Sequence, residues 1–186
     1  MVSSLVLLML QRQPDPVIVW RRQWQAKPVL KTAIRHTIQR ITVHHGGVKS
    51  NPNRTLEDKL RGLQAWSQRD DKLAGGKDKP AWPDIPYHFY IAIDGRIGEG
   101  RPYWFKGDTN TEYDPTGHLL IMVEGDFEQE EPTEAELKSL EAMLRFGLKK
   151  FKLGKESIKT HMDYAQTTCP GKALKAPLQA IIDRLP

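Results

Sequence analysis

Three side chains in this sequence have the types and spacing of zinc ligands: His44, His161 and Cys169. Zinc takes imidazole nitrogen at about 2.0–2.1 Å and thiolate sulfur at about 2.3 Å. Two nitrogens and one sulfur would leave the fourth tetrahedral position open for water, which is typical of a catalytic site. A zinc-bound thiol is deprotonated and needs no disulfide partner, which would explain a chain with a single cysteine.

Spacing alone leaves two interpretations of these residues open. The segment from His161 to Cys169 is mostly polar or turn-forming, so the chain could loop back and present both side chains to one ion. A histidine and a cysteine eight residues apart also occur by chance in many chains. A lone cysteine often packs as a small apolar residue, and His44 is equally compatible with an ordinary histidine at the end of a strand.

The elements that would position these side chains follow from apolar patterning. Residues 40–45 are rich in β-branched and apolar side chains and precede two glycines, which predicts a buried strand with His44 and His45 at its carboxyl end. Residues 119–123 predict a second buried strand. Residues 87–99, which contain an Asp-Gly turn, predict a β-hairpin.

Three other segments have the periodicity and caps of helices. Residues 55–68 and 134–150 carry leucines at helical spacing, and a capping box begins the second of them at Thr133. Residues 172–184 predict a last helix. Strands that alternate with helices predict an α/β fold, a single domain with a central mixed β-sheet flanked by helices. We expect residues 70–83 to form a flexible loop with solvated charges.

The composition describes an ordinary globular protein of 186 residues, 39% hydrophobic and 27% charged. Its formal net charge of +5 favours an anionic partner, but the basic residues are scattered, so we expect no nucleic-acid binding. Residues 1–10 are apolar but too short to span a bilayer, and they lack a basic start and a cleavage site. We therefore expect a lead-in or atypical export segment over residues 1–19, no stable membrane span, and the functional domain over residues 20–186.

Several short motifs occur in order along residues 20–186. They are Arg21-x-x-Trp24, Thr42-Val43-His44-His45, Trp82-Pro83-Asp84-Ile85-Pro86-Tyr87-His88-Phe89, Asp94-Gly95 with Glu99-Gly100-Arg101, Glu124-Gly125-Asp126-Phe127, Pro132-Thr133, and His161-x-Asp163 with Thr167-x-Cys169-Pro170-Gly171. This ordered set resembles the type 2 N-acetylmuramoyl-L-alanine amidases, the family that includes peptidoglycan recognition proteins and phage amidases. The set is far more specific than any one of its motifs.

The resemblance implies a zinc enzyme. It places the three ligands of one Zn²⁺ ion at His44, His161 and Cys169, the catalytic tyrosine at Tyr87, and a further catalytic side chain at Thr167. The implied reaction is hydrolysis of the amide between N-acetylmuramic acid and L-alanine of peptidoglycan stem peptides. The implied protein is a monomer that is secreted or acts in the periplasm or cell wall. Members that only recognise peptidoglycan commonly lack the cysteine, so Cys169 favours an active enzyme over a muropeptide-binding module that does not cut.

Two segments depart from the family pattern. Residues 70–81 are longer than in compact relatives, and residues 106–117 do not match the usual histidine-containing segment, so no substrate contact is transferred to them. Near the hairpin, Trp104 is the best candidate for stacking on a sugar or peptide. We expect Arg101 to be solvated.

The other titratable side chains receive separate predictions. Because neighbouring residues of a strand point to opposite faces, we expect His88 to pack on the face away from Tyr87. We expect His36 and His118 to lie at the surface. The proton carrier stays open between Tyr87, His88 and Glu124.

Overall fold

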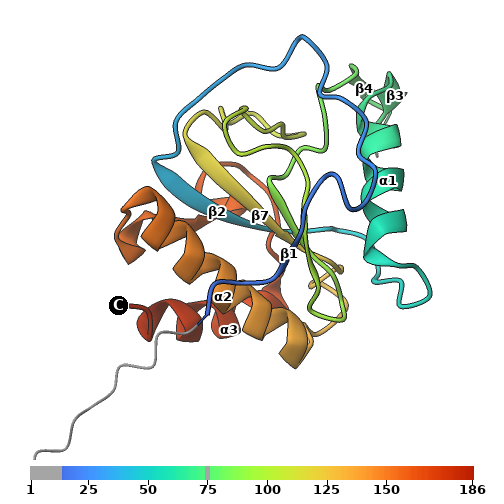
Figure 1. Cartoon of the computed structure of the whole chain (residues 1–186). Coiled ribbons are helices and arrows are strands. Elements are labelled where there is room, and N and C mark those ends of the chain that lie inside the picture. The colour runs from blue at the N-terminus through green and yellow to red at the C-terminus, as the bar shows by residue number, and fades with distance from the viewer. Residues whose placement is uncertain (1–13, 74–75) are drawn as a thin grey trace, which may run out of the picture.

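The computed structural model describes residues 14–73 and 76–186, and the apolar segment over residues 1–10 lies outside them. Within the described residues, a six-stranded sheet forms the centre of the fold, in the order β1-β6-β5-β7-β2-β8 (Figure 1). Its strands are β1 (Ile18–Val19), β2 (Arg40–His45), β5 (Phe89–Ile91), β6 (Ile97–Glu99), β7 (His118–Val123) and β8 (Ile158–Thr160). Neighbouring strands are parallel except in the antiparallel β5–β6 hairpin, so the sheet is mixed, as predicted.

Helices cover both faces of this sheet. Figure 1 shows α2 (Glu134–Phe151) and α3 (Lys172–Asp183) together on one face, and α1 (Leu56–Ser67) on the other. The predicted capping box of α2 is present, because Thr133 and Glu136 each accept a hydrogen bond from the other's backbone N–H. None of the helices within the described ranges is long and apolar enough to cross a membrane.

The alternation of side chains along β2 decides which of them reach the candidate site. Ile41 and Val43 point into the apolar core that the sheet shares with α2 and α3. The His44 side chain points to the opposite face of the sheet. It lies beside Met122 of β7, which belongs to the core on the α1 face. The candidate ligand therefore opens toward the space between the sheet and α1.

The described residues of the segment 70–83 form more regular structure than we predicted. They contain a small antiparallel hairpin made of β3 (Asp71–Lys72) and β4 (Asp78–Lys79). Lys79 is buried, its Nζ donates to the carbonyls of Ser67, Arg69 and Pro80, and it lies 4.8 and 4.6 Å from the ring centroids of Trp66 and Trp82. The prediction of a solvated charge is wrong at Lys79, because backbone carbonyls and aromatic faces replace water around the ammonium.

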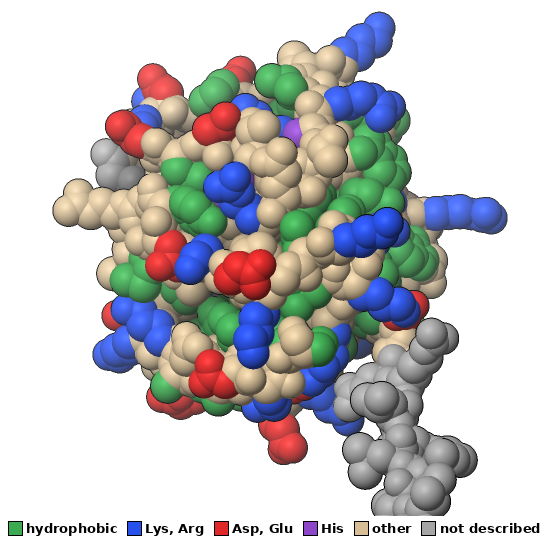
Figure 2. Space-filling model, turned by 90° about the vertical axis from the view of Figure 1, so that its left-hand side faces the viewer, with side chains coloured by type: hydrophobic (Ala, Val, Ile, Leu, Met, Phe, Trp, Pro, Cys, Tyr) green, Lys and Arg blue, Asp and Glu red, His purple; other side chains and the backbone are tan. Residues whose placement is uncertain are grey.

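On the face of the molecule that Figure 2 shows, charged side chains of both signs are mixed. On the face seen in Figure 2, the Lys and Arg side chains are interspersed with Asp and Glu, and apolar side chains lie between them. This agrees with the scattering of basic residues along the sequence.

Candidate metal centre

His44, His161 and Cys169 come together from three parts of the chain. His44 lies near the end of β2, His161 begins the short 3₁₀ helix η2 (His161–Asp163) directly after β8, and Cys169 lies in the loop before α3. Because β2 and β8 are parallel neighbours, both histidines are delivered to the same edge of the sheet. One potential ligand atom from each residue lies within 4.8 Å of the other two, and all three residues are buried. The structure thus brings the three predicted ligands together.

The donors and their separation fit a zinc ion. Ligand atoms at the usual zinc distances around a tetrahedron lie about 3.3–3.6 Å apart. Sγ of Cys169 lies 3.8 Å from Nδ1 of His44, and the His44 and His161 ring centroids are 4.6 Å apart. Thiolate with imidazole is a donor set that suits zinc better than magnesium or calcium.

Burial sets the protonation states of this cluster. It lowers the pKa of His44 well below its usual range, with a further contribution from His161, and it lowers the pKa of His161 to about 4. Both imidazoles are therefore neutral near pH 7, the form that can bind a metal. Burial also raises the pKa of the Cys169 thiol to about 12, although the backbone N–H of His45 donates to Sγ at 3.3 Å. A divalent cation bound to Sγ would reverse this and remove the proton.

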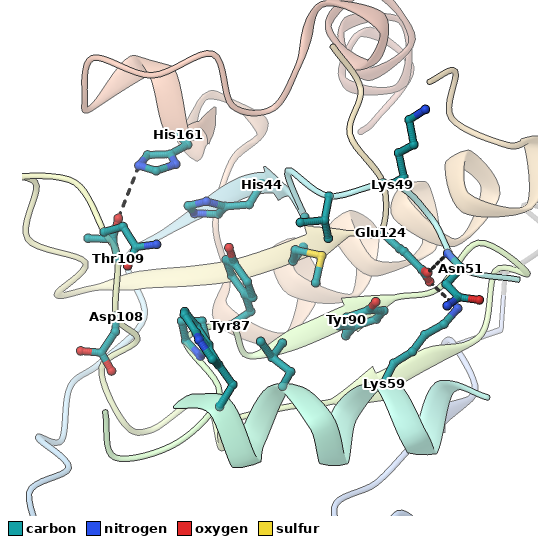
Figure 3. A pocket seen from close by; sticks show the side chains of 18 of the residues that line it. His44, Lys49, Asn51, Lys59, Tyr87, Tyr90, Asp108, Thr109, Glu124 and His161 are labelled. Atoms are coloured by element: carbon teal, nitrogen blue, oxygen red, sulfur yellow. Dashed lines mark hydrogen bonds and ion pairs between the residues drawn. The ribbon is translucent and has the colours of Figure 1, made fainter. Parts of the chain in front are cut away.

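The cluster opens into a groove of about 470 Å³ between the sheet and α1 (Figure 3). His44, His161, Tyr87 and Thr109 lie toward one end in this view, and Lys59 and Glu124 lie toward the other. Trp66 of α1 and Trp82 are part of the lining. A ligand in this groove would therefore contact both the candidate metal centre and an aromatic wall.

Tyr87 lies beside the candidate ligands. It lies two residues before β5, its ring centroid is 5.2 Å from that of His44, and it lines the groove. Burial raises the pKa of Tyr87 above its ordinary value, so the hydroxyl keeps its proton at neutral pH. Tyr87 can therefore act as a hydrogen-bond donor next to the cluster.

Thr167 is less directly placed. Its hydroxyl oxygen accepts a hydrogen bond from the N–H of Cys169 at 3.2 Å, and the side chain is half-buried. In the described part of the chain it is not among the residues that line the groove. The structure therefore connects Thr167 to the loop that carries Cys169, and its catalytic role stays a prediction.

Two of the three candidate proton carriers are occupied elsewhere. Glu124 forms a buried ion pair with Lys59 at 2.8 Å and also accepts from the backbone N–H groups of Asn51 and Ile93. His88 packs as predicted: Nδ1 accepts from the N–H of Leu120, and Nε2 lies 2.9 Å from the carbonyl oxygen of Phe105. Burial lowers the pKa of His88 to about 3, so this imidazole is neutral.

Two surface predictions fail. His118 is buried, with its Nδ1 2.8 Å from the hydroxyl oxygen of Thr42, and burial lowers its pKa to about 4. His36 is half-buried and is hydrogen-bonded to the backbone of Tyr103 and Gly117. Both histidines bond to neighbouring segments of the chain, and nothing in their local sequence indicates this.

Arg101 also differs from expectation. Arg101 is 1% exposed, donates to the carbonyls of Ile85 and Asp84, and pairs with Asp108, so it braces the loops beside the groove. Trp104 is 40% exposed but packs against its neighbours Tyr103 and Phe105. Trp66 and Trp82 are in the groove lining, and the stacking of a ligand on Trp104 stays a prediction.

Sequence reasoning missed two hydroxyl groups next to the candidate ligands. The Tyr113 hydroxyl lies 3.3 Å from Nε2 of His44, and Oγ1 of Thr111 lies 2.6 Å from Nε2 of His161. Both residues belong to residues 106–117, the segment that departs from the family pattern. The segment has no periodicity or motif that could have revealed these contacts.

Comparison with known proteins identifies the family. The family model described as N-acetylmuramoyl-L-alanine amidase matches residues 34–172, and the chain belongs to this type 2 amidase family. Mouse peptidoglycan recognition protein 1 is 27% identical over 167 residues, which cover 88% of this chain and 86% of that protein. Mouse N-acetylmuramoyl-L-alanine amidase is 28% identical over 166 residues, 86% of this chain and 29% of that protein.

A solved structure supports the same fold. The N-acetylmuramoyl-L-alanine amidase LysC from Clostridium intestinale superimposes with a TM-score of 0.71 at 26% identity, and the match covers 91% of this chain and 97% of LysC. The relatives thus include proteins named for recognition of peptidoglycan and proteins named for amidase activity.

Proposed function

We propose that this chain is a zinc-dependent hydrolase that cleaves the amide between N-acetylmuramic acid and the L-alanine of peptidoglycan stem peptides. The observation that carries the proposal is the complete His44, His161 and Cys169 set, with ligand atoms within 4.8 Å of one another and two of its members on the lining of a groove. A bound zinc ion would supply Lewis acidity toward a carbonyl oxygen and lower the pKa of a water molecule.

The protein's own groups have definite tasks in this reaction. His44 and His161 are neutral and preformed as ligands, so binding requires proton loss at Cys169 and not at the histidines. Tyr87 keeps its hydroxyl proton and lies beside His44, where it can donate to the oxygen of the scissile carbonyl as negative charge develops there. Such a donor typically contributes about 10²–10³ in rate.

Of the three candidate proton carriers, Tyr87 lies beside the candidate ligands, but its raised pKa favours hydrogen-bond donation over proton transfer. Glu124 is held by Lys59 at the other end of the groove, and His88 is buried between backbone groups. Thr167 is proposed to offer a second neutral hydroxyl to the tetrahedral intermediate. Its oxygen accepts from Cys169, and its own proton is not used by that bond.

The groove suits a substrate that combines a sugar with a charged peptide. Trp66 and Trp82 supply apolar faces, and Lys49 and Arg54 are cationic members of the lining. The net charge of +5 favours an anionic wall polymer as well. A cell-wall substrate would place the working protein in the periplasm, at the wall or outside the cell.

The alternative is a module that binds muropeptides without cutting them, which the relatives named for recognition favour. Incubation of zinc-loaded protein with muropeptides, followed by mass spectrometry, separates the two. The amidase should release free stem peptides that begin with L-alanine, and the Cys169→Ala protein should not. Measurable binding with unchanged muropeptides would contradict the amidase and support recognition.

A further inference from the structure

The loop over residues 106–117, between β6 and β7, places a hydroxyl group against each of the two candidate histidine ligands. The contact of Thr111 to His161 is short at 2.6 Å, and that of Tyr113 to His44 is longer at 3.3 Å. Both reach Nε2 of the histidine. The two histidines lie on different elements, and one loop contacts both of them from outside the cluster.

The choice of nitrogen matters because an imidazole has two, and a metal ligand must present the unprotonated one. Nδ1 of His44 is the nitrogen 3.8 Å from Sγ of Cys169, so it faces the cluster. With a metal on Nδ1, Nε2 would carry the proton and donate to the hydroxyl oxygen of Tyr113, 3.3 Å away. In His161, Nε2 lies 2.6 Å from Oγ1 of Thr111 and 3.5 Å from Oγ1 of Thr109, so Nδ1 is the nitrogen left for a metal.

Both hydroxyl groups are themselves held in place. Oγ1 of Thr111 lies 2.9 Å from Oγ1 of Thr109, a residue that lines the groove. The Tyr113 ring stacks on Tyr164 with centroids 5.6 Å apart and planes inclined by 21°. It also packs against His118 at 5.3 Å. Neither hydroxyl is therefore a mobile surface group that meets a histidine by chance.

We propose that Thr111 and Tyr113 are positioning residues that fix the tautomer and ring orientation of the zinc ligands His161 and His44. The inference rests on the proposed zinc site. It adds the residues that set the orientation of the two histidine ligands and so the affinity for zinc. Partners of this kind, bonded to the second nitrogen of a ligating histidine, typically contribute about 10–100-fold to metal affinity. Thr109 and Asp108 of the same loop also line the groove.

Zinc affinity of the full-length chain tests the proposal. Metal-free protein is titrated with zinc against a chelator of known affinity, and the absorption spectrum of the cobalt-substituted protein reports ligand geometry. Thr111→Val and Tyr113→Phe remove one hydroxyl each and keep the side-chain shape, and Thr111→Ser restores the first. Thr116→Val and Tyr103→Phe are matched controls, because the Thr116 hydroxyl bonds to Asp114 and the Tyr103 ring packs against Phe151.

We expect Thr111→Val and Tyr113→Phe to bind zinc about 10–100-fold more weakly and to shift the cobalt spectrum. Their metal-free melting temperature should match that of the wild type, and Thr111→Ser should recover the affinity. Wild-type affinity in both variants would overturn the proposal, as would an equal loss in the two controls. A wild-type chain that binds no zinc would overturn the proposed function itself, and this inference with it.

Discussion

Sγ of Cys169 lies 3.8 Å from Nδ1 of His44, and the backbone N–H of His45 donates to the same sulfur at 3.3 Å. One thiol therefore faces a candidate ligand on one side and the strand backbone on the other. The N–H is a donor suited to a thiolate, which is the state that zinc requires. The sulfur is placed to serve as an anion in a buried site.

Replacing Cys169 by alanine should remove the third ligand. We expect the zinc content of the purified protein to fall well below one equivalent and turnover of muropeptides to be lost. Elemental analysis measures the first and mass spectrometry the second. Thermal unfolding of the metal-free forms serves as the control for folding, and full activity in Cys169→Ala would exclude this residue from the site.

Replacing Tyr87 by phenylalanine should separate metal binding from catalysis. The ring stays beside His44, so zinc should be retained, but the rate should fall about 10²–10³-fold because the hydroxyl donor is gone. Steady-state rates at matched zinc content measure this. Tyr103→Phe is the control, since that ring packs against Phe151 away from the groove, and an unchanged rate in Tyr87→Phe would reject the proposed role.

Glu136 should make the fold less stable as the pH rises. Burial raises the pKa of this carboxyl from 4.5 to about 7, and Glu124 and Glu130 add to the effect. The folded state therefore holds the proton more tightly than the unfolded state. The contribution of the protonated Glu136 carboxyl to the free energy of unfolding is complete below pH 4.5 and is lost as the pH rises through about 7. This loss is on the order of 3 kcal/mol.

Glu136→Gln tests this directly, because glutamine can keep the capping box of α2 without a charge. The free energy of unfolding from denaturant titrations should rise relative to wild type at pH 8 and differ little at pH 4.5. Glu134→Gln, an exposed acid in the same first turn, should not change the pH dependence. Parallel pH profiles for wild type and Glu136→Gln would contradict the prediction.

Lys79→Met should destabilise the aromatic wall of the groove. The ammonium donates to three carbonyls and lies between Trp66 and Trp82, so its loss should cost about 2–4 kcal/mol and change tryptophan fluorescence. Lys77→Met, at an exposed position of the same hairpin, should have little effect. Equal unfolding midpoints for the two variants would show that Lys79 is not such a support.

The elements that carry apolar periodicity could be predicted well from the sequence. β2 has the predicted bounds of residues 40–45, and α2 begins after Thr133 as its capping box requires. These features depend on neighbouring residues alone. His44, His161, Cys169 and Tyr87 could be selected because their motifs occur in order, and the structure brings them together.

The failures share a physical cause. Lys79, Arg101 and His118 are polar residues that we expected to meet water, and each is buried against carbonyls, a carboxylate or a hydroxyl from distant segments. Burial of such groups is possible only when hydrogen bonds replace the lost water. The partners are supplied by the tertiary fold, and nothing in the flanking residues indicates them.

The strand β8 has three residues and lies at the edge of the sheet, and it leads directly into His161. A metal ion shared by His44 and Cys169 would act as a cross-link between positions 125 residues apart. Such a link would fasten the last part of the chain to the centre of the sheet. The metal-free protein would then be most easily cleaved by proteases near residues 161–171. Metal at a concentration of 1,000 Kd would stabilise the fold by about 4 kcal/mol.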